Sequence, residues 1–140
     1  METPLERIKA TIDGYKRLLA IIEQHADSEG VCKLSKMKIS LQYGISYTGT
    51  LKKLGCLEKH NLIIKTEGGF KRTGKDVLED TPFSLLLKLL LLVIEKPEIY
   101  SSFKQQAEIL NVSFDDVRSA WGFYGYFFGT KYPSVQEANE

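Results

Sequence analysis

The segment from Met37 to Asp76 most constrains the fold, because its hydrophobic spacing changes along its length from helical to strand-like. In its first part apolar residues recur at the spacing of a helix face, but Gly44 interrupts the pattern and suits a sharp turn. After Asn61 the β-branched run LIIKT, the turn EGG and the run FKRT indicate a β-hairpin with a glycine tip. The segment therefore predicts two short helices followed by a hairpin.

Sequence signals also give approximate bounds for the helices before the hairpin. Apolar residues recur at helical spacing from Leu5 to about Gln24, which predicts a first helix. A short helix is expected from about Ser35 to Gln42. Ser46 is placed as the N-cap of a further helix from Tyr47 to about His60. The buried face of that last helix is expected to consist of Tyr47, Leu51, Leu54 and Leu57.

The predicted order of helices, turn and hairpin is that of a winged helix-turn-helix domain. The runs KISLQYGISY, LKKLGCLEKHNLI and FKRTGKDVLED resemble the archaeal winged helix-turn-helix DNA-binding proteins, small chromatin-associated proteins and virus- or plasmid-type transcriptional regulators. The resemblance covers roughly Ile8 to Asp80. It implies a mainly α fold with a small β-hairpin wing, double-stranded DNA as partner and a homodimer. We expect the DNA-binding domain to span residues 1–81 and a helical dimerisation region to span 82–140.

The distribution of charge supports a polyanionic partner. The whole chain has a net charge of +1, but Lys33 to Lys75 contains ten basic residues against only Glu58 and Glu67. The remaining residues comprise nine basic and sixteen acidic ones. A basic segment of this kind attracts polyanions. The alternative is a solvated charged face with no ligand.

Candidate DNA contacts lie on the helix expected from Tyr47, on the helix before it and on the hairpin. Hydroxyl groups can bond phosphates or bases, and lysines supply charge. Only Gln42 and Arg72 are nearby candidates for strong base discrimination, so we expect modest sequence specificity. Gly49 would permit close approach to DNA or to a neighbouring helix, and Gly55 a generic helix contact. The candidate contacts are Lys36, Lys38, Gln42, Ser46, Tyr47, Thr48, Thr50, Lys52, Lys53, Lys65, Lys71 and Arg72.

Two apolar segments after Pro82 predict self-association. The leucine-rich run from Phe83 to Ile94 contains Lys88 and is too short to cross a bilayer, so a buried helix and no membrane partner are expected. The run WGFYGYFFG combines aromatic residues with glycines spaced along one helix face. The expected dimerisation residues are Leu86, Leu90, Trp121, Phe123, Tyr124 and Phe127.

Residues 103–124 carry a second pattern of the helix-turn-helix kind, with NVS as the turn. Its second helix would begin with Asp115 and Asp116, which phosphates repel, so a packed helical pair is favoured. A second DNA-reading unit using Lys104 and Arg118 is the open alternative. The residues that carry the spacing are Ala107, Asn111, Val112, Val117 and Ala120.

Enzymatic, metal and cofactor functions find little support in the sequence. Cys56 and His60 have a spacing that metal ligands can use, with Cys32 and His25 upstream, but no Cys-x-x-Cys element accompanies them. No phosphate loop or catalytic triad motif is present.

With two cysteines and no secretory start, the chain is expected to be cytoplasmic and nucleoid-associated. The prediction is a homodimeric transcriptional regulator or chromatin protein. The alternative is a winged-helix protein-interaction adaptor in replication or in plasmid or virus partition.

Overall fold

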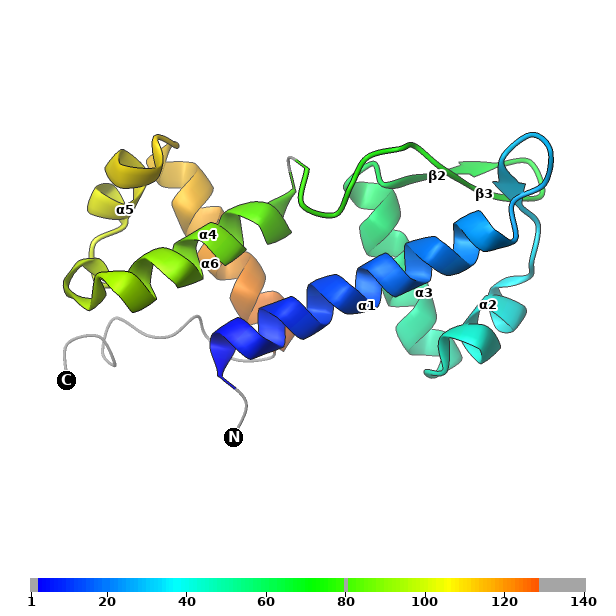
Figure 1. Cartoon of the computed structure of the whole chain (residues 1–140), viewed down its shortest axis with the longest axis horizontal. Helices are drawn as coiled ribbons and strands as arrows, with labels where there is room; N and C mark the ends of the chain where they lie inside the picture. The colour runs from blue at the N-terminus through cyan, green and yellow to red at the C-terminus, as the bar shows by residue number, and fades with distance from the viewer. Residues whose placement is uncertain (1–2, 80, 129–140) are drawn as a thin grey trace. The chain divides into compact units, whose positions relative to one another are not determined.

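The computed structural model describes residues 3–79 and 81–128, the last three by their backbone alone. The fold is mainly helical with a small antiparallel sheet, as predicted (Figure 1). The chain forms two compact units: the N-terminal unit, Thr11–Glu79, and the C-terminal unit, Met1–Ala10 with Asp80–Glu140. This division lies close to the expected boundary at residue 81, but the first ten residues group with the C-terminal part.

Three helices and three strands build the N-terminal unit. The helices and the hairpin match the sequence prediction to within about two residues, whereas the first strand was not predicted. That strand has only two residues, so it lacks the alternating pattern by which strands are recognised. The elements are α1 (Pro4–Gln24), whose first turns belong to the other unit, β1 (Val31–Cys32), α2 (Lys36–Tyr43), α3 (Tyr47–Lys59), β2 (Ile63–Thr66) and β3 (Gly69–Arg72).

Two serine caps and one glycine define the two ends of α2 and the start of α3. The Ser35 hydroxyl accepts a hydrogen bond from the Lys38 amide at the start of α2. Gly44 ends α2 with a φ of 87°, a left-handed conformation that glycine adopts without strain. The Ser46 hydroxyl then accepts from the Gly49 amide at 3.0 Å and caps α3. These caps confirm the predicted roles of Gly44 and Ser46.

Tyr43 attaches the end of α2 to α1. Its hydroxyl donates to the Gly14 carbonyl at 2.7 Å, and its own carbonyl accepts from Arg17 Nη1 at 2.7 Å. The Arg17 guanidinium also lies 4.3 Å from the centre of the Tyr43 ring. Burial raises the pKa of Tyr43. These contacts fix the position of the α2–α3 pair on α1.

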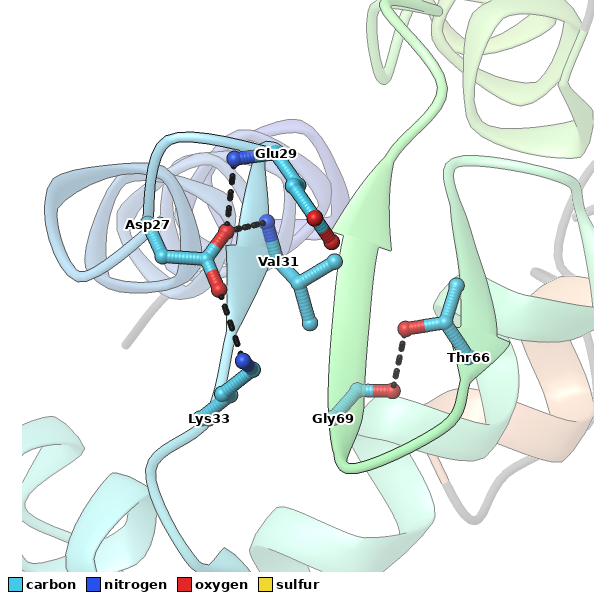
Figure 2. Close-up of polar contacts among 6 residues, drawn as sticks. All are labelled: Asp27, Glu29, Val31, Lys33, Thr66 and Gly69. Carbon is cyan, nitrogen blue, oxygen red and sulfur yellow. Dashed lines mark hydrogen bonds and ion pairs between the residues drawn. The ribbon is translucent and has the colours of Figure 1, made fainter.

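The sheet has the strand order β1-β3-β2. Figure 2 shows how the turn before β1 is held: the Asp27 carboxylate accepts from the Glu29 and Val31 amides at 2.9 and 3.0 Å, and pairs with Lys33 at 3.1 Å. A side chain at Gly69 would overlap the Cys32 carbonyl, so β1 can lie against β3 only because this residue is glycine. Gly68, with a φ of 85°, forms the hairpin tip.

The C-terminal unit is a small helical bundle in which α6 packs against α4 and α5. Its interior includes Phe83 against Phe123, edge to face at 5.0 Å, and Tyr100 stacked on Trp121 at 5.9 Å. The elements are α4 (Pro82–Glu95), the 3-10 helix η1 (Pro97–Ile99), α5 (Phe103–Leu110) and α6 (Phe114–Phe128).

The turn between α5 and α6 repeats the construction of the turn between α2 and α3. Ser102 caps an eight-residue helix, Asn111 ends it in a left-handed conformation with a φ of 56°, and Ser113 accepts from the Asp116 amide at 3.0 Å. These three residues follow Ser35, Gly44 and Ser46 by the same interval of 67 residues. Each unit thus contains a pair of helices joined by a short turn with the same local caps.

Candidate nucleic-acid interface

A strip of exposed residues runs along α3. Thr48, Lys52, Gly55 and Lys59 are spaced by four, three and four residues, so they lie on one side of the helix, and all four are exposed. Within the described residues neither Lys52 nor Lys59 forms an ion pair. The only acidic residue of α3 is Glu58. We call these four residues the α3 strip.

Positive potential extends to the C-terminal end of α3. Burial and the charges of Lys59 and Lys75 lower the pKa of His60. The Lys75 ammonium donates to the His60 carbonyl at 3.2 Å, where the last carbonyls of a helix favour a cation. The end of α3 therefore combines two lysines with a histidine that tends to stay neutral.

Two expectations for α3 are corrected by the burial of its side chains. Thr50, predicted to face DNA, has an exposed fraction of 0%, and its hydroxyl donates to the Ser46 carbonyl at 3.0 Å. Tyr47, placed on the expected buried face, is instead 41% exposed. The buried face comprises Thr50, Leu54 and Leu57, so Leu54 and Leu57 are buried as predicted, whereas Thr50 is buried in place of Tyr47. The Ser46 side chain is exposed but engaged in the cap.

Lys53 is turned toward α1. Its ammonium lies 4.6 Å from the centre of the Tyr15 ring, and burial lowers the pKa of Lys53. Burial also raises the pKa of the neighbouring Cys56 thiol, which shares a hydrogen bond with Tyr15. Lys53 is therefore a half-buried residue whose stem packs against α1 and whose tip is charged, and its role as a DNA contact stays a prediction.

On α2 the predicted residues mix with exposed apolar ones. Lys38 is exposed and Lys36 is half-buried. Gln42 is exposed, and its Oε1 lies 2.8 Å from His25 Nε2, which holds the side chain near the end of α1. Met37, Leu41 and Ile45 recur every four residues and are all exposed. We call these three residues the α2 strip.

The hairpin separates the basic residues that the sequence placed together. Lys65 lies opposite Phe70, and Lys71 lies opposite Ile64, so the two lysines are on opposite faces of the sheet. Arg72 forms an ion pair with Glu23 of α1 at 2.8 Å. Arg72 is thus paired within the N-terminal unit, and its expected role in base recognition stays a prediction. Lys65 and Lys71 are exposed.

Most of the predicted dimerisation residues lie inside the C-terminal unit. Leu86, Leu90, Trp121 and Tyr124 are buried, and Phe123 is half-buried against Phe83. Their interpretation as surface residues is corrected, because their apolar area is used within the bundle. Phe127 lies outside the described side chains.

The other expectations concern metals and membranes. No three His, Cys, Asp or Glu side chains gather as metal ligands in the described ranges 3–79 and 81–128. None of the helices described combines the length and the apolar character needed to cross a bilayer.

The chain was compared with family models, with curated proteins and with solved structures, and no match was found in any of the three comparisons.

Gly55 and Lys59 belong to the α3 strip but were not among the predicted contacts. The prediction concentrated on the first turn of α3, where recognition helices meet base edges. The signal was nevertheless available, because the spacing from Thr48 through Lys52 to Lys59 is that of one helix face once Leu54 and Leu57 fix the opposite one.

Proposed function

We propose that the N-terminal unit is a winged helix-turn-helix domain that binds double-stranded DNA. In this proposal α2 and α3 form the helix-turn-helix, the hairpin of β2 and β3 forms the wing, and α3 enters the major groove. The observation that carries it is the α3 strip, whose lysines have no acidic partner in the described part of the chain. An exposed helix with unpaired lysines and a bare backbone position suits a groove lined with phosphates.

The chemistry of the strip favours affinity over sequence discrimination. Lysines act on phosphates as point charges, whereas the bidentate side chains that discriminate bases best are absent from the strip. Gln42 and Arg72, the nearby candidates for such contacts, are held by His25 and Glu23. The proposed protein is therefore a transcriptional regulator or chromatin protein with modest sequence specificity.

The helix-turn-helix geometry of the C-terminal unit has a different surface. α6 begins with Asp115 and Asp116, and Arg118 is paired with Asp115 at 3.0 Å. Phosphates would meet two carboxylates at the position where α3 offers Thr48 and Gly49. The proposal accordingly assigns DNA to α3 and not to α6.

Salt titration of binding to a duplex tests the proposal. Affinity of the full chain for a 20-base-pair duplex, measured by fluorescence anisotropy, should fall steeply with rising salt because counterions are released. Lys52→Gln with Lys59→Gln should weaken binding to all duplexes and reduce the logarithmic salt slope by about 2. The control pair is Lys96→Gln with Lys104→Gln, exposed lysines of the C-terminal unit, and it should leave the slope unchanged. Binding that is absent, or insensitive to salt, contradicts the proposal.

The second candidate function is an adaptor that docks another protein, and the α2 strip favours it. Leu41 is 74% exposed, Met37 lies one turn before it on α2, and Ile45, in the turn after α2, is 37% exposed. Exposed apolar side chains that line up in this way are more typical of protein contacts than of phosphate contacts. The adaptor function predicts that wild-type protein has negligible duplex affinity at physiological salt, so the same titration separates the two candidates.

A further inference from the structure

Gly55 has no structural reason to be glycine. It lies within α3, four residues before the last residue of the helix, and no positive φ is recorded for it. A Cβ placed there would meet no atom within 4 Å. Glycine at an interior helical position disfavours the helix about fivefold relative to alanine. The fold by itself therefore favours alanine at position 55.

Other glycines of the N-terminal unit differ from Gly55 in this respect. Gly44 and Gly68 have a positive φ, and Gly69 lies against the Cys32 backbone. At Gly49 a Cβ would lie 3.1 Å from the Ser46 hydroxyl and 3.3 Å from the Ile45 side chain. The expected roles of the two α3 glycines are thus exchanged: Gly49 is crowded by its own helix cap, and Gly55 is open to solvent.

The surroundings of Gly55 indicate what approaches it. On the α3 strip it lies between Lys52 and Lys59, each within about one turn. The strip is therefore a bare patch of helix backbone with an unpaired cation on either side. Such a patch suits a negatively charged partner that fits closely enough for a methyl group to be unfavourable.

We propose that Gly55 is the point at which α3 lies closest to the floor of the major groove, with Lys52 and Lys59 reaching the phosphates around it. This inference rests on the proposed function and adds the depth and direction of insertion. The α3 strip, and not the first turn of α3 alone, then faces the base edges. A Cβ at position 55 holds the helix away from the groove and weakens every contact along the strip.

Gly122 provides a matched control within the same chain. It follows Gly55 by 67 residues, so it occupies the equivalent position in the second helix-turn-helix geometry. It is exposed, and a Cβ there would also meet nothing within 4 Å. Its helix starts with Asp115 and Asp116, which disfavour DNA. Alanine at 55 and at 122 should thus strengthen both helices, whereas only the change at 55 should affect DNA.

The experiment compares Gly55→Ala and Gly122→Ala in the full chain by thermal denaturation and by anisotropy with the same 20-base-pair duplex. Neither variant should lower the melting temperature. Gly55→Ala should weaken duplex binding about tenfold or more, in keeping with the loss of one closely fitted groove contact. Gly122→Ala should bind within about twofold of the unmodified protein.

The outcomes separate this inference from the proposed function. If the unmodified chain does not bind the duplex, the proposed function and this inference both fail. If the unmodified chain binds and Gly55→Ala binds equally well, DNA binding stands and the inference is overturned. Equal losses in both variants, or a lower melting temperature for Gly55→Ala, also overturn it, because the effect would then arise from the fold and not from the groove.

Discussion

Asp27 illustrates how a single carboxylate holds a turn that no periodicity predicts. Hydrogen bonds from the Val31 amide and the Lys33 side chain hold its pKa below the ordinary value. A group whose pKa is lowered in the folded state stabilises the fold above its unfolded pKa, and the contribution is lost as the pH falls through the folded pKa. We expect Asp27→Asn to lower the melting temperature at pH 7. The melting temperature of the variant should also fall less than that of the wild type when the pH is lowered from about 5 to about 3. Equal declines in the variant and the wild type would contradict this expectation.

The control for Asp27 is Glu29→Gln, an exposed carboxylate two residues away whose side chain has no hydrogen-bond or ion-pair partner among the described residues. It should leave both the melting temperature and its pH dependence nearly unchanged.

Gly69 determines whether β1 can join the sheet. Because a Cβ would overlap the Cys32 carbonyl, Gly69→Ala requires β1 and β3 to move apart. We expect a loss of about 2 kcal/mol or more in the free energy of unfolding, measured by urea denaturation, as for other overpacked sites. Gly55→Ala, at an open position, is the matched substitution and should not destabilise. A stable Gly69→Ala variant would show that the close approach of the two backbones is unimportant.

At the scale of elements, Gln106 joins η1, α5 and α6. Its amide nitrogen donates to the Ile99 and Tyr100 carbonyls at 3.0 and 2.9 Å, and its oxygen accepts from Trp121 Nε1 at 2.9 Å. Gln106→Leu keeps the size but removes these partners in a buried position. We expect the free energy of unfolding to fall by about 2–3 kcal/mol, because unsatisfied buried groups are costly. The neighbouring exposed Gln105→Leu should change it by less than about 0.5 kcal/mol. Similar effects of the two substitutions would contradict the role given to Gln106.

The elements also show which parts of the fold the sequence could predict. The helix bounds, the Gly44 turn and the hairpin followed from local signals, because caps, glycines and β-branched runs act through neighbouring residues. The two-residue β1 depends on Asp27 just before it and on Gly69 in its partner strand β3, which is distant from β1 in sequence. The burial of Thr50 and the contacts of Lys53 and Arg72 with Tyr15 and Glu23 of α1 depend on tertiary packing, which local signals do not reveal.

At the scale of the whole molecule, self-association stays a prediction, but different residues are now expected to form the contact. The leucines and aromatic residues that the sequence predicts for dimerisation are largely interior. Two other residues of α4, Leu91 and Ile94, have exposed fractions of 47% and 58%. We expect the full chain to sediment as a dimer at micromolar concentration, because exposed apolar residues on one helix favour association. Leu91→Glu should weaken the dimer at least about tenfold by placing a charge in the contact. Lys104→Glu, at an exposed position of α5, is the control and should have little effect. A wild-type chain that sediments as a monomer would contradict the dimer.

The recurrence of one turn at an interval of 67 residues has a consequence for how this chain could be altered. In each helix pair, a serine caps the first helix, a residue in the left-handed conformation ends it, and a second serine caps the next helix. These three positions specify the backbone without reference to the residues that point outward. The three capping positions therefore do not determine which ligand the helix pair binds. The same positions support exposed lysines on α3 and an acidic first turn on α6. Exchanging the outward residues of α3 and α6 would exchange the surfaces and keep both turns. Such an exchange would move the ligand preference from one helix pair to the other and would leave the backbone of both pairs unchanged.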